Sequence, residues 1–275
     1  GKCTSTVSAI NDRAREVKFH AAQMKVLSVN DGLGVKLNFT HKGEHLSVHL
    51  PRALKESERA DVVIRYRVSK PQAGLYFIKP DSHYPRKAVQ LWTHAETEEA
   101  RYWFPCFDAP HDKATTEMIV SVPKNFFALS NGALLSVNER GPKKTFHWRQ
   151  AVAHSPYLVT LVAGKFSEIA DEWSGIPIQY YCEPGREEDT RRAFGKTPKM
   201  VKFFSESIGV KYPYEKYAQI AVSDFIMGGM EHTTATTQTD RLLMDARAYP
   251  EFTADWLVSH ELAHQWFGDL LTCKE

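Results

Sequence analysis

The sequence predicts a mainly β N-terminal domain, built as an antiparallel sandwich or saddle, followed by the front part of an α+β domain. Short runs of alternating apolar and polar residues, bounded by Gly, Pro, Asn or Asp, fill residues 17–182. Strands that follow one another without helices between them are typical of an antiparallel sandwich. The composition changes near Glu183, and helical apolar patterns then appear. We place the domain boundary between residues 170 and 171, which gives domains of residues 1–170 and 171–275.

The expected strands include a segment with three histidines, His41, His45 and His49. On a helix these histidines would share one face, as the ligands of a metal cluster do. Gly43 and the strand-like alternation favour histidines on a solvated strand face instead. The expected strands are Gln23–Val29, Val35–Phe39, His45–Leu50, Asp61–Val68, Gly74–Ile78, Thr116–Val122, Phe126–Ser130, Thr145–Gln150, Tyr157–Ala163 and Ile176–Tyr181.

Residues 93–110 differ from the strands around them because they mix acidic and aromatic residues with two prolines. This composition favours an ordered loop, which serves either as a packed crossover or as part of a functional site. Further along, Glu187–Ile208 reads as a helix that Gly195 and Pro198 weaken in the middle. Tyr214–Phe225 reads as a strand.

Composition and charge exclude several classes of function. An apolar fraction of 43% and a charged fraction of 25% are those of a soluble globular protein. A net charge of +2 gives no reason to expect a nucleic acid or a membrane surface as partner, and no apolar stretch is long enough to span a membrane. The four cysteines are scattered, which argues against a cysteine zinc site and favours a reducing, cytoplasmic compartment.

The strongest motif is H-E-x-x-H at residues 260–264, inside a run with apolar residues at helical spacing. Residues four apart on a helix lie on one face, so His260 and His264 can direct two imidazole nitrogens at one metal ion. Glu261 lies one step round the helix and is placed to act on a water as general base. The alternative is a buried helix with two histidines that only form hydrogen bonds.

A second motif, Gly-Gly-Met-Glu, lies at residues 228–231. The glycines Gly228 and Gly229 allow a sharp turn or a close approach of the backbone to a ligand. Glu231 then places a carboxylate beside that backbone. By itself this motif is weak, and a plain turn at the end of a strand is the alternative.

These stretches occur together, and in this order, in one known family. The chain resembles the M1 family of zinc aminopeptidases, the gluzincins that include aminopeptidase N and leukotriene A4 hydrolase. The run H-E-L-A-H-Q-W-F-G at 260–268 is similar to the family's zinc helix, and residues 228–232 resemble its G-x-M-E-N motif. Glu96 and residues 100–110 resemble the loop through which the family's N-terminal β domain reaches the active site. The similarity covers nearly the whole chain.

The resemblance implies a thermolysin-like catalytic domain and a zinc-dependent enzyme that removes N-terminal residues from peptides. His260 and His264 would be two of three zinc ligands, and the third, a Glu, would lie beyond residue 275. Glu261 would be the general base. Glu96 and Glu231 would bind the free α-ammonium group of the substrate through charge-assisted hydrogen bonds.

The peptide itself would bind along Gly228, Gly229 and Met230 like an added strand. Two positions depart from the family's pattern. His232 stands where the family usually has Asn, and His94 stands where the N-terminal loop commonly has Gln. We expect His232 to add positive charge and to weaken ammonium binding, so the substrate preference is left open.

The chain looks like a fragment of a larger protein, whose missing C-terminal part is the expected partner. Asp269 is expected on the zinc helix itself and is no substitute for the third ligand. Two histidines alone bind zinc far more weakly than a closed set of three ligands. Two further readings stay open: an inactive scaffold that binds other proteins, and a thermolysin-like endopeptidase that would have no use for Glu96 and Glu231.

Overall fold

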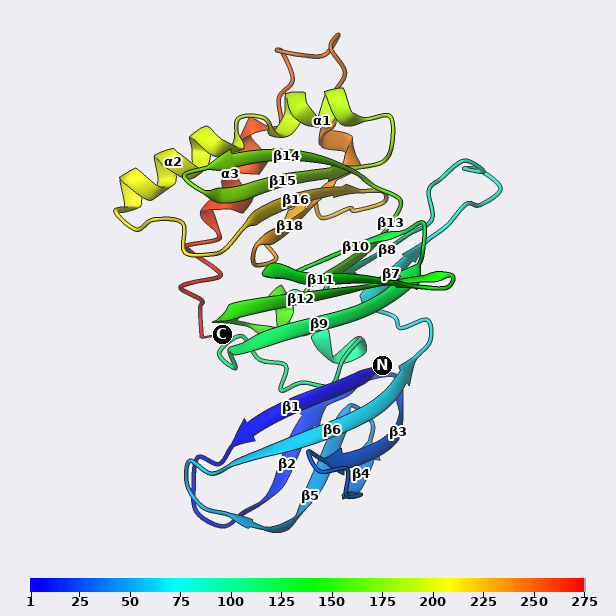
Figure 1. The fold of residues 1–275 in the computed structure, drawn as a ribbon, viewed down its shortest axis with the longest axis vertical. Coiled ribbons are helices and arrows are strands. Elements are labelled where there is room, and N and C mark those ends of the chain that lie inside the picture. Colours follow the sequence, from blue (N-terminus) through cyan, green and yellow to red (C-terminus); the bar gives the residue numbers. More distant parts are fainter. Residues whose placement is uncertain (275) are drawn as a thin grey trace.

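The computed structural model describes residues 1–274, which form three stacked tiers along the long axis of the molecule (Figure 1). The two lower tiers in the view are all-β, and the third combines a mixed sheet with helices. The prediction of a mainly β N-terminal part followed by an α+β part is therefore confirmed. No helix among residues 1–274 is long and apolar enough to cross a membrane.

The first tier is a sandwich of two three-stranded antiparallel sheets, ordered β1-β6-β3 and β2-β5-β4. Alternate residues such as Phe19, Leu46 and Ile64 point inward and form its core. The segment with three histidines is a β-hairpin, as its alternation predicts. The strands are β1 (Lys2–Ser8), β2 (Ala14–His20), β3 (Met24–Asp31), β4 (Asn38–Lys42), β5 (His45–Leu54) and β6 (Arg59–Val68).

The second tier is another antiparallel sandwich, with sheets ordered β10-β13-β8-β7 and β11-β12-β9. Residues 95–110 form the expected loop, with one 3-10 turn at Ala100–Tyr102, whereas Thr93 and His94 belong to a strand. The Asp108 carboxylate holds the loop because it accepts hydrogen bonds from Arg101 Nε at 2.8 Å and Arg101 N at 3.1 Å. The strands are β7 (Gly74–Ile78), β8 (Gln90–His94), β9 (Ala114–Pro123), β10 (Phe127–Ser130), β11 (Ala133–Arg140), β12 (Lys143–His154) and β13 (Leu161–Gly164).

The third tier is a five-stranded mixed sheet ordered β14-β15-β16-β18-β17, in which β15, β16 and β18 run parallel and β17 forms an edge. Every residue of β16 and β18 is buried, as is usual for central parallel strands. The predicted domain boundary at 170/171 lies within β14 and stays a prediction. The strands are β14 (Ser167–Trp173), β15 (Ile176–Cys182), β16 (Tyr217–Val222), β17 (Gly229–Met230) and β18 (Ala235–Thr239).

Three helices complete this tier: α1 (Glu187–Phe194), α2 (Thr197–Ile208) and α3 (Asp255–Ala263). The single helix expected from 187 to 208 is thus two, which separate at Gly195. Pro198 lies in the first turn of α2, where a missing N–H disturbs no helical bond. The helix with the H-E-x-x-H motif ends at Ala263, so the expectation that Asp269 lies on it is wrong. Beyond the end of α3 the chain folds back, and the Asp269 N–H donates to the His264 carbonyl at 3.0 Å.

The second and third tiers share one hydrophobic core. Trp92, Leu129 and Trp148 of the sandwich pack against a set from the mixed sheet that includes Ile220, Phe225 and Met230. Polar contacts cross the same junction, since Asn131 Nδ2 donates to the Thr233 carbonyl at 2.7 Å. This packing fixes the loop of residues 95–110 relative to the mixed sheet.

Lys216 lies buried in this junction, with 4% of its surface exposed. Its ammonium nitrogen is 2.8 Å from the Thr234 carbonyl and 3.2 Å from the Ser130 carbonyl, and it lies over the Trp148 ring. Burial lowers the pKa of Lys216 from its ordinary value of 10.5 to about 7. Between these two pH values the unfolded chain binds more protons than the folded chain, so the contribution of Lys216 to stability rises with pH.

We predict that Lys216→Met removes a pH-dependent component of stability. The difference in unfolding free energy, wild type minus variant, should rise with pH between about 7 and about 10.5, by at most about 1.4 kcal/mol per pH unit. Urea unfolding at several pH values measures it. Lys199 is exposed, so Lys199→Met is the matched control. It should leave the pH dependence of the unfolding free energy unchanged. Equal slopes for wild type and Lys216→Met would contradict the burial argument.

Candidate active site

The two histidines of the motif face each other at the end of α3. His260 Nε2 and His264 Nε2 lie 3.1 Å apart. Two ligands of a tetrahedral zinc ion with bonds of 2.0–2.1 Å are about 3.3 Å apart, so this separation fits two ligands of one ion. His264 Nδ1 donates to the Phe267 carbonyl at 2.9 Å, which leaves its Nε2 lone pair free for a metal.

The rest of a metal-binding set is not found in the described part of the chain. Within residues 1–274, no three His, Cys, Asp or Glu side chains come together as metal ligands. The third ligand expected beyond residue 275 lies outside the described residues. Asp269 is fully buried and joins no such group with His260 and His264 within residues 1–274.

Three carboxylates from distant parts of the sequence converge beside the histidines. Glu96 comes from the loop of the second tier, Glu231 follows β17, and Glu261 lies on α3. Burial, with the charges of Glu231 and Glu96, raises the pKa of Glu261 to about 8. Burial and the charge of Glu231 also raise the pKa of Glu96, while His264 lowers it. The site therefore holds an excess of acid groups, which cations would complement.

The two glycines of the second motif line this site. A Cβ on Gly229 would overlap the Glu261 side chain, so any other residue at this position would displace that carboxylate. Gly228 has a φ of +89°, a backbone conformation that residues with a side chain rarely adopt. Among the described residues β17 pairs with β18 alone, and its other edge could accept an added strand. Met230 is buried in the core shared with the second tier.

The two histidines that replace amides carry no charge at neutral pH. His232 is completely buried, its Nδ1 is 3.0 Å from Thr237 Oγ1, and burial lowers its pKa well below the ordinary value. Burial lowers the pKa of His94 to about 4. The expectation that His232 adds positive charge is therefore wrong, because desolvation keeps the ring neutral. His94 instead contacts the ring of Phe225 edge-on.

One functional residue escaped the sequence analysis. Gln265 is fully buried; its Nε2 donates to the Glu231 carbonyl at 3.0 Å, and its Oε1 accepts from Thr234 N at 2.9 Å and Tyr212 OH at 3.2 Å. The side chain next to His264 thus ties the end of α3 to the loop that carries Glu231. A glutamine in a helical run gives no sign of these contacts, which depend on tertiary structure.

We predict that Gln265→Met destabilises the protein by about 3 kcal/mol, since it leaves the Glu231 carbonyl and the Thr234 N–H buried without partners. Urea unfolding measures the change. Gln238→Met is the matched control: Gln238 is equally buried, and within residues 1–274 its amide donates only to Gln219 Oε1, at 3.3 Å. Gln238→Met should lower the free energy of unfolding by about 1 kcal/mol. Equal costs for both variants would show that Gln265 has no special role in holding this loop.

Comparisons with known proteins agree with this geometry. Residues 1–158 match the Peptidase M1 N-terminal domain and residues 192–275 match the Peptidase family M1 domain. The chain is 31% identical to aminopeptidase N of Acetobacter pasteurianus, over 87% of this chain and 70% of the relative.

Two longer relatives show how much of such proteins the chain represents. It is 29% identical to aminopeptidase M1 of Arabidopsis thaliana, over 98% of this chain and 33% of the relative. It is 28% identical to the puromycin-sensitive aminopeptidase of Caenorhabditis elegans, over 96% of this chain and 30% of the relative. The chain thus spans about a third of the length of these two relatives. By both domain matches and by its relatives, the chain belongs to peptidase family M1.

Proposed function

We propose that the full-length protein is a zinc-dependent aminopeptidase that removes N-terminal residues from peptides with a free N-terminus. The observation that carries this proposal is the convergence of Glu96, Glu231 and Glu261 beside the facing nitrogens of His260 and His264. Such a group of acids and imidazoles offers separate places for an ammonium group and a metal ion. The names of the M1 relatives support the same activity.

Glu96 and Glu231 would hold the α-ammonium group of the substrate. Both carboxylates accept charge-assisted hydrogen bonds, which are stronger than neutral ones, and Glu231 is largely withdrawn from water. The backbone of β17 would then bind the extended peptide along its free edge. Because Glu261 packs directly on Gly229, the peptide bond that follows the first residue would lie at the general base.

His260 and His264 would supply two ligands to zinc, which when bound polarises the carbonyl of the scissile bond and makes water a better nucleophile. Glu261 would accept the proton of the attacking water and pass it to the leaving amine. It can accept a proton only when ionised. Burial and the nearby carboxylates oppose ionisation, and the positive charge of a bound ammonium group favours it. Substrate binding thereby prepares the base.

We predict that the full-length protein, supplied with zinc, hydrolyses alanine anilide but not N-acetylalanine anilide. The acetylated compound has no ammonium group for Glu96 and Glu231 to bind. Glu261→Gln keeps the size of the side chain but removes the base, so kcat should fall about 10²–10⁴-fold. Absorbance of the released aniline measures both rates.

Equal hydrolysis of the two anilides would contradict the ammonium site and favour an endopeptidase. Hydrolysis of neither anilide would contradict the enzymatic proposal and favour a scaffold. Removal of the metal by a chelator should abolish the activity and zinc should restore it, which distinguishes this hydrolysis from a contaminating metal-independent enzyme.

A further inference from the structure

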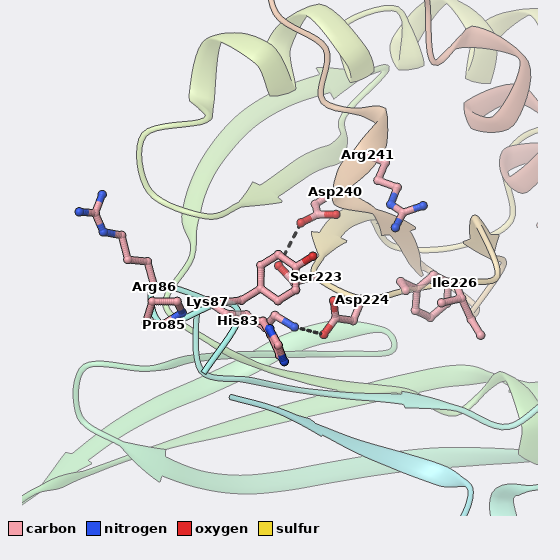
Figure 2. Close-up of a pocket in the computed structure, with 11 residues that line it drawn as sticks. His83, Pro85, Arg86, Lys87, Ser223, Asp224, Ile226, Asp240 and Arg241 are labelled. Atoms are coloured by element: carbon pink, nitrogen blue, oxygen red, sulfur yellow. Dashed lines mark hydrogen bonds and ion pairs between the residues drawn. The ribbon is translucent and has the colours of Figure 1, made fainter. Parts of the chain in front are cut away.

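A cavity of about 660 Å³ lies apart from the residues assigned so far, at the C-terminal ends of β16 and β18 (Figure 2). Its volume is in the range of ligand sites, and clefts at the carboxyl ends of parallel strands are frequent binding sites. Residues 83–87 of the second tier form one wall. Residues 223–226 and 240–241 of the third tier form the other.

The cavity continues the line of β17. Thr239 N donates to the Gly228 carbonyl at 2.7 Å, so Gly228 lies beside the end of β18, where Asp240 and Arg241 begin the cavity wall. Ile226, two residues before Gly228, lines the cavity and is 89% exposed. A peptide with its ammonium group at Glu231 would run antiparallel to β17, past Gly229 to Gly228, beside which the cavity wall begins. At about 3.3 Å per residue, its third and fourth residues reach this cavity.

Several polar groups of the cavity wall already have partners. Lys87 Nζ lies 2.8 Å from Asp224 Oδ2 and 3.6 Å from Asp81 Oδ2. The Ser223 hydroxyl lies 3.0 Å from Asp240 Oδ2 and 2.9 Å from Glu183 Oε1. The pair formed by Lys87 and Asp224 also fixes the wall from the second tier against the third tier.

Arg241 differs from these groups because it forms no ion pair with any of residues 1–274. Figure 2 shows its guanidinium group on the same side of the view as Ile226, and both residues line the cavity. Arg86 likewise forms no ion pair with the residues that the structure describes, but it extends away from the other residues of the wall. A guanidinium group presents paired donors that match a carboxylate.

We propose that this cavity binds the third and fourth residues of a peptide substrate and that Arg241 recognises a carboxylate there, from an acidic side chain or from the C-terminus of a short peptide. The inference rests on the proposed function, because the ammonium site sets the direction of the peptide. It adds a specificity-determining residue that does not take part in the hydrolysis itself.

Peptides of matched length test the proposal in the full-length protein with zinc. Release of the first alanine is compared for Ala-Ala-Asp-Ala amide and Ala-Ala-Asn-Ala amide, and for the free acid and the amide of Ala-Ala-Ala. The peptide with a carboxylate should have a kcat/KM about tenfold higher in at least one pair, which is the effect of about 1.4 kcal/mol in binding. The pair that shows the difference identifies the source of the carboxylate.

Arg241→Gln should abolish this difference, whereas Arg86→Gln, with the same change of charge, should retain it. Both variants should hydrolyse alanine anilide at the wild-type rate, since this substrate is too short to reach the cavity. The inference would be overturned if the wild type hydrolysed the anilide normally but showed no carboxylate preference. It would also be overturned if the preference survived Arg241→Gln. Either result would leave the proposed function intact. A preference for Lys over Asn at the third residue would also overturn it, by assigning the cavity to Asp224 and Asp240. A wild type that fails to hydrolyse the anilide would overturn both proposals.

Discussion

The contact between the second and third tiers is the interaction on which the rest of the structure depends. Trp148 and its neighbours bury one face of the mixed sheet. Across the same junction Asn131 donates to the Thr233 carbonyl and Lys216 donates to the Ser130 carbonyl. Because this contact is a packed core rather than a loose domain interface, the loop with Glu96 is held beside Glu231. One wall of the cavity near Arg241 depends on the same contact. Neither site exists in one tier alone.

Electrostatics explains why such a contact is needed. Burial, and to a lesser degree repulsion between the carboxylates, raises the pKa values of Glu96 and Glu261. This arrangement costs stability, and a fold keeps it only where the surrounding packing compensates. The hydrogen bonds of Gln265 to the loop after β17 are part of that compensation. A substrate ammonium group and a metal ion would relieve the repulsion, so the strain of the free site contributes to binding.

Local patterns in the sequence predicted local features well. The spacing of His260 and His264 predicted facing nitrogens, and alternation predicted most strands of the sandwiches. β1 was missed because every second residue is only half buried, which leaves a weak apolar pattern. Features that depend on tertiary burial could not be read from the sequence: the neutral state of His232 and the contacts of Gln265. The meeting of Glu96 with Glu231 followed only from the family resemblance, since about half the chain separates them.

A double-mutant cycle between Glu96 and Glu231 tests most directly whether the two tiers build one ammonium site. The values of kcat/KM for alanine anilide are measured for the full-length wild type, Glu96→Gln, Glu231→Gln and the double variant. If both carboxylates hold the same ammonium group, their effects are not additive, with a coupling free energy of about 1 kcal/mol or more. Additive effects, or no effect of Glu96→Gln, would contradict the account, because Glu96 would then act apart from Glu231.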